Sequence, residues 1–135
     1  MTTSYRVGVD VASVSAVSAS WSRFGDAYLA RVFTEHEIEV CGGPDPDTGR
    51  LAARFAAKEA VIKVLRPVDE PVNLRDIEIR RDPGGWCTVE LRAGAAHIAE
   101  REGLAQITVS ISHEGELAVA MAMGTFESVP DGDAR

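Results

Sequence analysis

Two acidic side chains, Asp10 and Glu59, stand in the segments of this sequence that are best placed to carry chemistry. Asp10 lies near the end of the β-branched run Arg6–Val11, and a carboxylate that emerges from a strand end is well placed for a site. Glu59 lies within a basic segment, four residues before Lys63. This spacing makes Glu59 and Lys63 neighbours on a helix, so they form either a plain surface ion pair or part of a site.

The segment around Glu59 is an island of positive charge on an acidic protein. Its basic residues are Arg50, Arg54, Lys58, Lys63 and Arg66, and Glu59 is its single acidic residue. The segment therefore favours a polyanionic ligand, with a solvated basic helix face as the alternative.

The same segment is the strongest helical stretch of the chain. It runs from about residue 50 to 65, between the breaker-rich loop 42–49 and Pro67. At helical spacing, one narrow apolar arc is formed by Leu51, Phe55, Ile62 and Leu65. Lys58 falls within this arc and Arg54 flanks it, a costly placement unless the two charges meet an anion or another subunit. The alanines between them let other groups approach the helix closely.

The remaining patterns predict a small mixed domain around this helix. Aromatic and aliphatic residues at helical spacing predict a helix that turns its aromatics to the core; they are Trp21, Phe24, Tyr28, Leu29 and Val32. Thr34 and Glu37 match a capping box for a short helix. A hairpin is expected over residues 77–91, and a helix over 93–102 that ends at Gly103.

A second hairpin follows over residues 107–123, with Ser112 and His113 at its tip. We expect one domain over residues 1–126 and a disordered polar tail over residues 127–135. His36 and His97 are interpreted as structural histidines.

Composition excludes several classes of protein. The chain has 135 residues and a formal net charge of −7, which argues against a non-specific nucleic-acid surface or an anionic membrane patch. The N-terminus lacks the apolar region of a signal peptide and no stretch reaches membrane-spanning length, so a cytoplasmic location is expected. Cys41 and Cys87 have no metal-ligand spacing and are expected to be reduced thiols.

Three blocks of the sequence together resemble the holo-acyl-carrier-protein synthase family of 4′-phosphopantetheinyl transferases. They are Val7-Gly8-Val9-Asp10-Val11, the run from Ala53 to Lys63 that contains RFAAKEA, and Val109-Ser110-Ile111-Ser112-His113. The resemblance extends over roughly residues 6–124. It implies an α+β fold in which a small antiparallel sheet packs with a long central helix, one domain per chain.

The resemblance also implies an activity, the transfer of the 4′-phosphopantetheine group of coenzyme A to a serine of an apo acyl carrier protein. Asp10 and Glu59 would then hold Mg²⁺, with Mn²⁺ as an open alternative, because hard carboxylate oxygens suit these ions. Glu59 would accept the serine proton, either directly or through a metal-bound water, and Lys63 would neutralise the pyrophosphate. Arg54 and Lys58 would contact phosphates, and Ser112 and His113 would contact the 3′-phosphate end of coenzyme A.

Short members of this family are trimers with active sites between subunits, so a homotrimer is expected. The stretch after Asp10, residues 12–17, is uncharged where the family usually carries an arginine that docks the carrier. This departure predicts a carrier of fatty-acid or polyketide biosynthesis that is bound through more apolar contacts than usual. The alternative is a non-catalytic subunit that binds the carrier or coenzyme A. No P-loop or GxGxxG motif supports a nucleotide-binding enzyme of another kind.

Overall fold

A computed structural model describes residues 2–128 of the chain as one α+β domain. Its five strands form one antiparallel sheet in the order β1-β5-β4-β3-β2. The strands are β1 (Thr3–Ser13), β2 (Ile77–Arg81), β3 (Cys87–Leu91), β4 (Leu104–Glu114) and β5 (Leu117–Glu127). The predicted fold class is confirmed.

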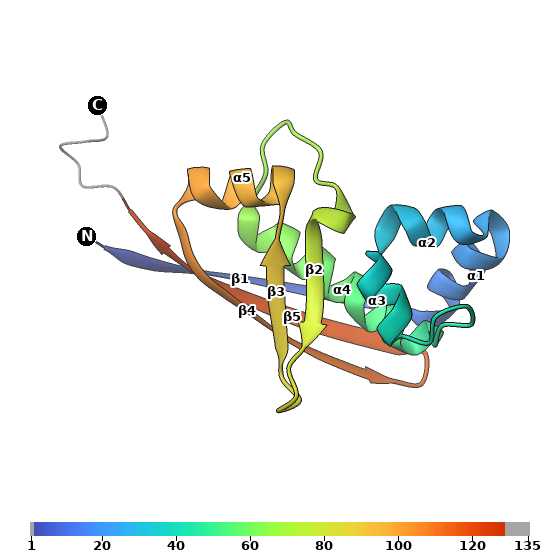
Figure 1. Ribbon diagram of the computed structural model, residues 1–135. Helices are drawn as coiled ribbons and strands as arrows, with labels where there is room; N and C mark the ends of the chain where they lie inside the picture. The colour runs from blue at the N-terminus through green and yellow to red at the C-terminus, as the bar shows by residue number, and fades with distance from the viewer. Residues whose placement is uncertain (1, 129–135) are drawn as a thin grey trace.

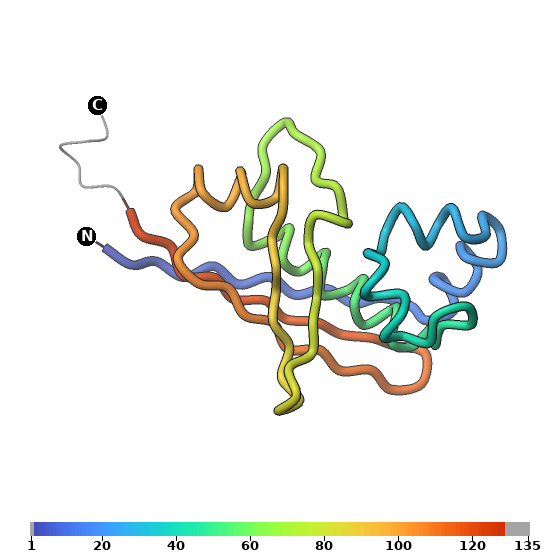
Figure 2. Tube along the Cα trace, in the orientation of Figure 1, coloured from blue at the N-terminus to red at the C-terminus, as the bar shows by residue number. Residues whose placement is uncertain are grey.

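The long strands β1, β5 and β4 form the floor on which the site is built. In Figure 1 the β2–β3 hairpin runs steeply across them, in keeping with a β3–β4 pairing that includes only Cys87 and Val109. Figure 2 shows the start of β1 beside the end of β5, where Thr3 pairs with Glu127. Glu127 therefore belongs to the sheet rather than to the predicted tail, and residues 129–135 lie outside the described residues.

Helices cover one face of the sheet. They are α1 (Val14–Phe24), α2 (Asp26–Val32), α3 (Glu35–Val40), α4 (Thr48–Leu65), the 3₁₀ turn η1 (Leu74–Asp76) and α5 (Ala93–Glu102). The predicted capping box is present, because Thr34 Oγ1 accepts from Glu37 N and Glu37 Oε1 accepts from Thr34 N. None of the helices within residues 2–128 is long and apolar enough to cross a membrane.

The helix predicted around Trp21 is two helices. Gly25 has a φ of +66°, which breaks the run between α1 and α2. Trp21 and Tyr28 pack partly buried against the core, but Phe24 is 58% exposed, so the prediction that it is a core residue is wrong. The sequence pattern did not reveal this break, because the apolar residues on both sides of Gly25 keep one helical spacing.

Helix α4 is the centre of the molecule, and it is buried on far more than one arc. Its short residues are almost fully buried, namely Ala52, Ala53, Ala56, Ala57 and Ala60. Gly8 lets β1 lie directly against it, since a Cβ on Gly8 would stand 2.2 Å from Ala60 O and 2.9 Å from Lys63 Cβ. Close packing at Gly8 brings the end of β1 to the second half of α4.

Candidate functional site

Asp10, Glu59 and Lys63 come together where β1 passes α4. Lys63 Nζ lies 3.3 Å from Asp10 Oδ1 and donates to Val9 O at 2.7 Å. The ammonium is thus turned to β1, and the ion pair that it forms is with Asp10 rather than with Glu59. The Asp10 side chain is 22% exposed and that of Lys63 is 53% exposed, so the cluster is open to a ligand from solvent.

Glu59 faces the same cluster from α4. Partial burial raises the pKa of the Glu59 carboxyl above its ordinary value, and the nearby Asp10 carboxylate raises it further, while Lys63 opposes both. Two carboxylates therefore share one ammonium and carry an excess negative charge. Such a pair attracts a cation and makes Glu59 a better proton acceptor than an ordinary surface glutamate.

An apolar cavity of about 370 Å³ opens beside Asp10. It lies between the end of β1 and the helices α1, α2 and α4, with η1 at its border. Its apolar lining includes Val11, Ala12, Val17, Val32 and Phe55. A ligand that brings a polar group to the two carboxylates can therefore place an adjacent apolar group in this cavity.

A second cluster, the basic cavity, lies at the start of α4. It has a volume of about 340 Å³ and is lined by Arg50, Ala53, Arg54, Arg81, Ile111, Ser112 and His113. The His113 ring packs against the start of α4, because a Cβ on Gly49 would stand 3.3 Å from it. The structure thus brings together Arg54, Ser112 and His113, all of which were predicted to bind coenzyme A.

Arg54 is the buried cation of the basic cavity. Its side chain is almost fully buried, Nη1 donates to Arg50 O at 3.4 Å, and Nε has no partner within the described residues. An unpaired buried guanidinium nitrogen is costly, and an anion in the cavity would satisfy it. The cavity therefore suits a phosphate or another small anion.

Two cations of the basic cavity were missed by the sequence reasoning. Arg50 belongs to the predicted positive island, and its position at the first turn of α4 could have been noticed. Arg81 ends β2 next to the predicted turn, where nothing in the local pattern separates it from an ordinary surface arginine. Arg50 lies beside Arg54 by helical spacing, whereas Arg81 does so only because the fold brings the end of β2 to the start of α4.

Lys58 is not part of either cluster, and the prediction that it contacts a phosphate is corrected. Its side chain is fully buried, and Nζ lies 2.6 Å from Glu37 Oε1. It also donates to Leu74 O at 2.9 Å and to Ile77 O at 2.5 Å. Its three donors are therefore occupied within the protein, and the costly placement is resolved by Glu37 of the same chain rather than by a ligand.

The two clusters lie on different sides of α4 in one subunit. Arg54 and Glu59 are five residues apart, which places them about 140° apart around the helix. Asp10 pairs with Ala120 and Ala120 with Ile111, so the cluster at β1 and the one at β4 are two strands apart, about 10 Å. The helix itself stands between the carboxylates and the basic cavity.

Comparison with known proteins gives consistent matches over most of the chain. Residues 6–122 match a family model described as the 4′-phosphopantetheinyl transferase superfamily. The holo-[acyl-carrier-protein] synthase of Desulforudis audaxviator is 40% identical over 122 residues, which is 90% of this chain and 93% of that protein.

Solved structures agree with these matches. The ACPS of Chronobacterium ammoniagenes without ligand has a TM-score of 0.82 at 31% identity, over 94% of this chain and 100% of that one. Its coenzyme A complex has a TM-score of 0.81 at 32% identity, over 93% and 99% of the two chains.

Proposed function

The chain belongs to the 4′-phosphopantetheinyl transferase superfamily, and from this premise we propose that Asp10, Glu59 and Lys63 form its catalytic centre. The protein is an enzyme that transfers the 4′-phosphopantetheine group of coenzyme A to a serine of an apo acyl carrier protein. The products are the holo carrier protein and adenosine 3′,5′-bisphosphate. The observation that carries the proposed centre is the meeting of the three side chains at the crossing of β1 and α4.

The reaction joins the serine oxygen to the phosphorus that carries pantetheine and breaks the bond from that phosphorus to the oxygen of the adenosine 5′-phosphate. The serine proton goes to the Glu59 carboxylate, whose raised pKa suits it to this role. Lys63 stabilises the negative charge that grows on the leaving phosphate, because its half-exposed ammonium is held at the cluster by Val9 O and Asp10.

The two carboxylates fit a magnesium ion. No group of three or more His, Cys, Asp or Glu side chains within residues 2–128 could hold a metal, but Mg²⁺ is commonly held by one or two carboxylates together with substrate phosphates and water. The negative charge of Asp10 beside the Glu59 carboxylate favours such an ion. When bound at Asp10 and Glu59, Mg²⁺ would supply charge neutralisation for the diphosphate, and Mn²⁺ has the same ligand preference.

The basic cavity is the second half of the proposed site. Arg54, Ser112 and His113 offer donors to the 3′-phosphate end of coenzyme A, with Arg50 and Arg81 adding positive charge. Since α4 separates this cavity from the carboxylates, we assign the two halves of each active site to different subunits. A homotrimer closes such a head-to-tail contact into a ring.

One face of the sheet supports this assembly. Alternate residues of β1 and β5 expose large apolar side chains on it, namely Tyr5, Val7, Val9, Val11, Leu117, Val119, Met121 and Met123. A contiguous apolar face of this kind marks an association surface. We propose that copies of the chain cover it.

The carrier protein is proposed to dock at the apolar cavity beside Asp10. Helix α1 has no charged residue before Arg23, and Arg31 on α2 is a further cation near this face. A carrier of fatty-acid or polyketide biosynthesis would place its serine at the carboxylates and an adjacent apolar side chain in the cavity. Carrier affinity should then change little with added salt, and a steep loss of affinity in salt would argue for ionic docking.

A cytoplasmic location remains part of the proposal. The two cysteines, Cys41 and Cys87, are free and buried, which suits a reducing compartment.

Transfer of phosphopantetheine tests the function directly. Purified protein, coenzyme A, Mg²⁺ and a panel of apo carrier proteins are incubated, and intact mass reports the added group. We expect modification by the wild-type protein and a loss of roughly 10²–10⁴-fold in rate for Glu59→Gln. Glu100→Gln, on the exposed side of α5, is the matched control with unchanged rate. Binding of coenzyme A without modification of any carrier would favour a non-catalytic binding subunit instead.

A further inference from the structure

Much of the packing surface of α4 consists of alanine methyl groups. Its alanines pack in a core that includes the buried side chains of β5, which are Ala118, Ala120 and Ala122. Short side chains leave shallow ridges and grooves, so steric interlocking at this contact is weak. The larger buried side chains of α4, which are Leu51, Val61, Val64 and Leu65, fill the rest of its surface, and polar contacts can add a directional constraint to this packing.

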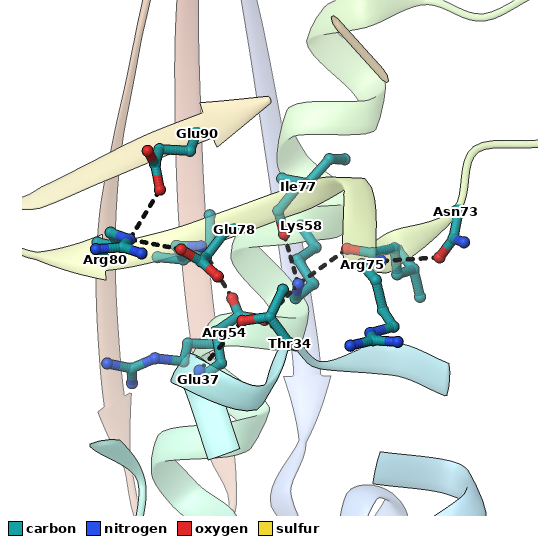
Figure 3. Close-up of polar contacts among 12 residues, drawn as sticks. Thr34, Glu37, Arg54, Lys58, Asn73, Arg75, Ile77, Glu78, Arg80 and Glu90 are labelled. Carbon is teal, nitrogen blue, oxygen red and sulfur yellow. Dashed lines mark hydrogen bonds and ion pairs between the residues drawn. The ribbon is translucent and has the colours of Figure 1, made fainter. Parts of the chain in front are cut away.

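Lys58 makes polar contacts whose strength depends on direction as well as on distance. It projects from the middle of α4, and its ammonium reaches Ile77 O at the start of β2 (Figure 3). The same ammonium donates to Leu74 O in η1. A cation held by fixed carbonyls tolerates only a narrow range of positions, unlike an apolar side chain in an alanine-lined space.

Glu37 completes the contact from the other side. Its carboxylate is fully buried and lies 2.6 Å from Lys58 Nζ, accepts from Thr34 N at the start of α3, and accepts from Ile79 N of β2 at 2.9 Å. The Lys58–Glu37 pair therefore joins α4 to α3, η1 and β2 at one point of the core.

We propose that Lys58 and Glu37 are positioning residues that fix the rotation and the axial register of α4, and so hold Glu59 and Lys63 against Asp10. This inference rests on the proposed function, because it concerns the geometry of the same centre. A buried ion pair is weak evidence for stability, since apolar replacements of similar volume are often as stable, and fixing one arrangement is the better attested use of such a pair.

The geometry shows why the register matters. Glu59 follows Lys58 by one residue, which is about 100° around the helix. Lys63 follows Glu59 by four residues, which is a little more than one turn. A slip of one residue would move Glu59 by about 1.5 Å along the axis and swing it away from β1. Misplacement on this scale is enough to cost roughly 100-fold in rate.

The test removes both charges in the double variant Lys58→Met/Glu37→Gln. In the wild-type protein, Gly8 and Lys63 lie in contact, so a nuclear Overhauser effect (NOE) should join Gly8 Hα to the Lys63 β-methylene. We expect the variant to keep its helices, to lose this signal, and to show a kcat that is lower by roughly 10–100-fold. Lys63→Ala should lower kcat strongly in the wild-type background and only slightly in the double variant, because Lys63 no longer faces Asp10.

Val64→Ala is the matched control, a buried truncation on α4 that removes no polar contact of its side chain. It should lower stability but leave kcat and the NOE unchanged. If the double variant does not fold, Glu37→Gln alone decides the question, and it should weaken the NOE and lower kcat less. A folded variant that keeps both the NOE and the wild-type kcat overturns the inference. The NOE is independent of turnover, so failure of the wild-type protein to modify a carrier would count against the proposed function alone.

Discussion

Gly8 shows how much of the site depends on one missing methyl group. The residue lies two positions before Asp10, and a Cβ there would stand 2.2 Å from Ala60 O, far inside contact distance. Gly8→Ala should therefore push β1 away from α4, with a loss of roughly 1–3 kcal/mol in the free energy of unfolding. Because Asp10 moves with β1, kcat should fall by roughly 10–100-fold.

Thermal unfolding and the intact-mass assay measure the two effects of Gly8→Ala. Gly94→Ala is its control, since the nearest atom to a Cβ there is Asp76 Oδ2 at 3.6 Å and the position lies within α5. Its stability should be unchanged or slightly higher. A Gly8→Ala protein with wild-type kcat would show that the exact approach of β1 to α4 does not matter for the reaction.

Side chains inside the recognisable blocks could be placed from the sequence, whereas their partners from elsewhere could not. The structure brings Asp10, Glu59 and Lys63 to one cluster as predicted, although their catalytic roles remain proposals. Lys58 was assigned to a phosphate because its partner Glu37 is 21 residues earlier and was interpreted only as a capping residue. Helical spacing shows that a charge is buried, but only the tertiary fold shows which opposite charge meets it.

At the scale of elements, the ends of helices and strands at glycine and proline residues could be predicted from the sequence. The angles at which these elements cross one another could not. The predicted helix over residues 93–102, ended by Gly103, coincides with α5, and the hairpin strands β2 and β3 lie where alternation placed them. The steep angle of this hairpin to the long strands left no trace in the sequence, yet it carries Arg81 into the basic cavity.

The β2–β3 hairpin also carries an acid-sensitive contact. Glu78 is buried on β2 and accepts from Arg92 at 3.0 Å and from Arg80 at 2.5 Å. Burial would raise the pKa of this carboxyl, but the hydrogen bonds from Arg92 and Arg80 outweigh it and hold the pKa well below the ordinary value.

A lowered pKa in the folded state means that ionised Glu78 stabilises the fold above its ordinary pKa of 4.5 and that this stabilisation is lost as the pH falls below it. Glu78→Gln should therefore have a lower melting temperature than the wild-type protein at neutral pH, and the gap should narrow steadily as the pH falls below 4.5. Thermal unfolding across this range measures it, with Glu100→Gln as control. A gap that stays constant with pH would show that the arginines do not hold Glu78 ionised.

At the scale of the whole molecule, the exposed apolar face of β1 and β5 is the observation that supports the proposed trimer. Met121 on this face is 51% exposed in the isolated subunit. Met121→Glu should leave the subunit folded but prevent assembly, because a carboxylate would be buried without a partner. Light scattering should show a trimer for the wild-type protein and a monomer for the variant, together with loss of transfer.

Val68→Glu is the matched control for Met121→Glu. Val68 is 70% exposed but lies in the loop after α4, away from the sheet face, so the variant should stay trimeric and active. A wild-type protein that is monomeric and active would contradict the assembly and the division of the site together.

The division of each site between two subunits can be tested separately from the oligomeric state. Glu59→Gln removes the proposed proton acceptor from one half, and His113→Ala removes a side chain of the basic cavity from the other. Each variant alone should be nearly inactive. If the halves of a site come from neighbouring subunits, random mixing of equal amounts should restore about one quarter of the sites, because each site needs one intact half from each kind of subunit. To exchange subunits at random, the two variant proteins are partially unfolded and refolded together. Each single variant is treated in the same way as a control. If both halves of a site came from one subunit, every site in the mixture would keep one defect, and the transfer rate would stay at the level of the single variants.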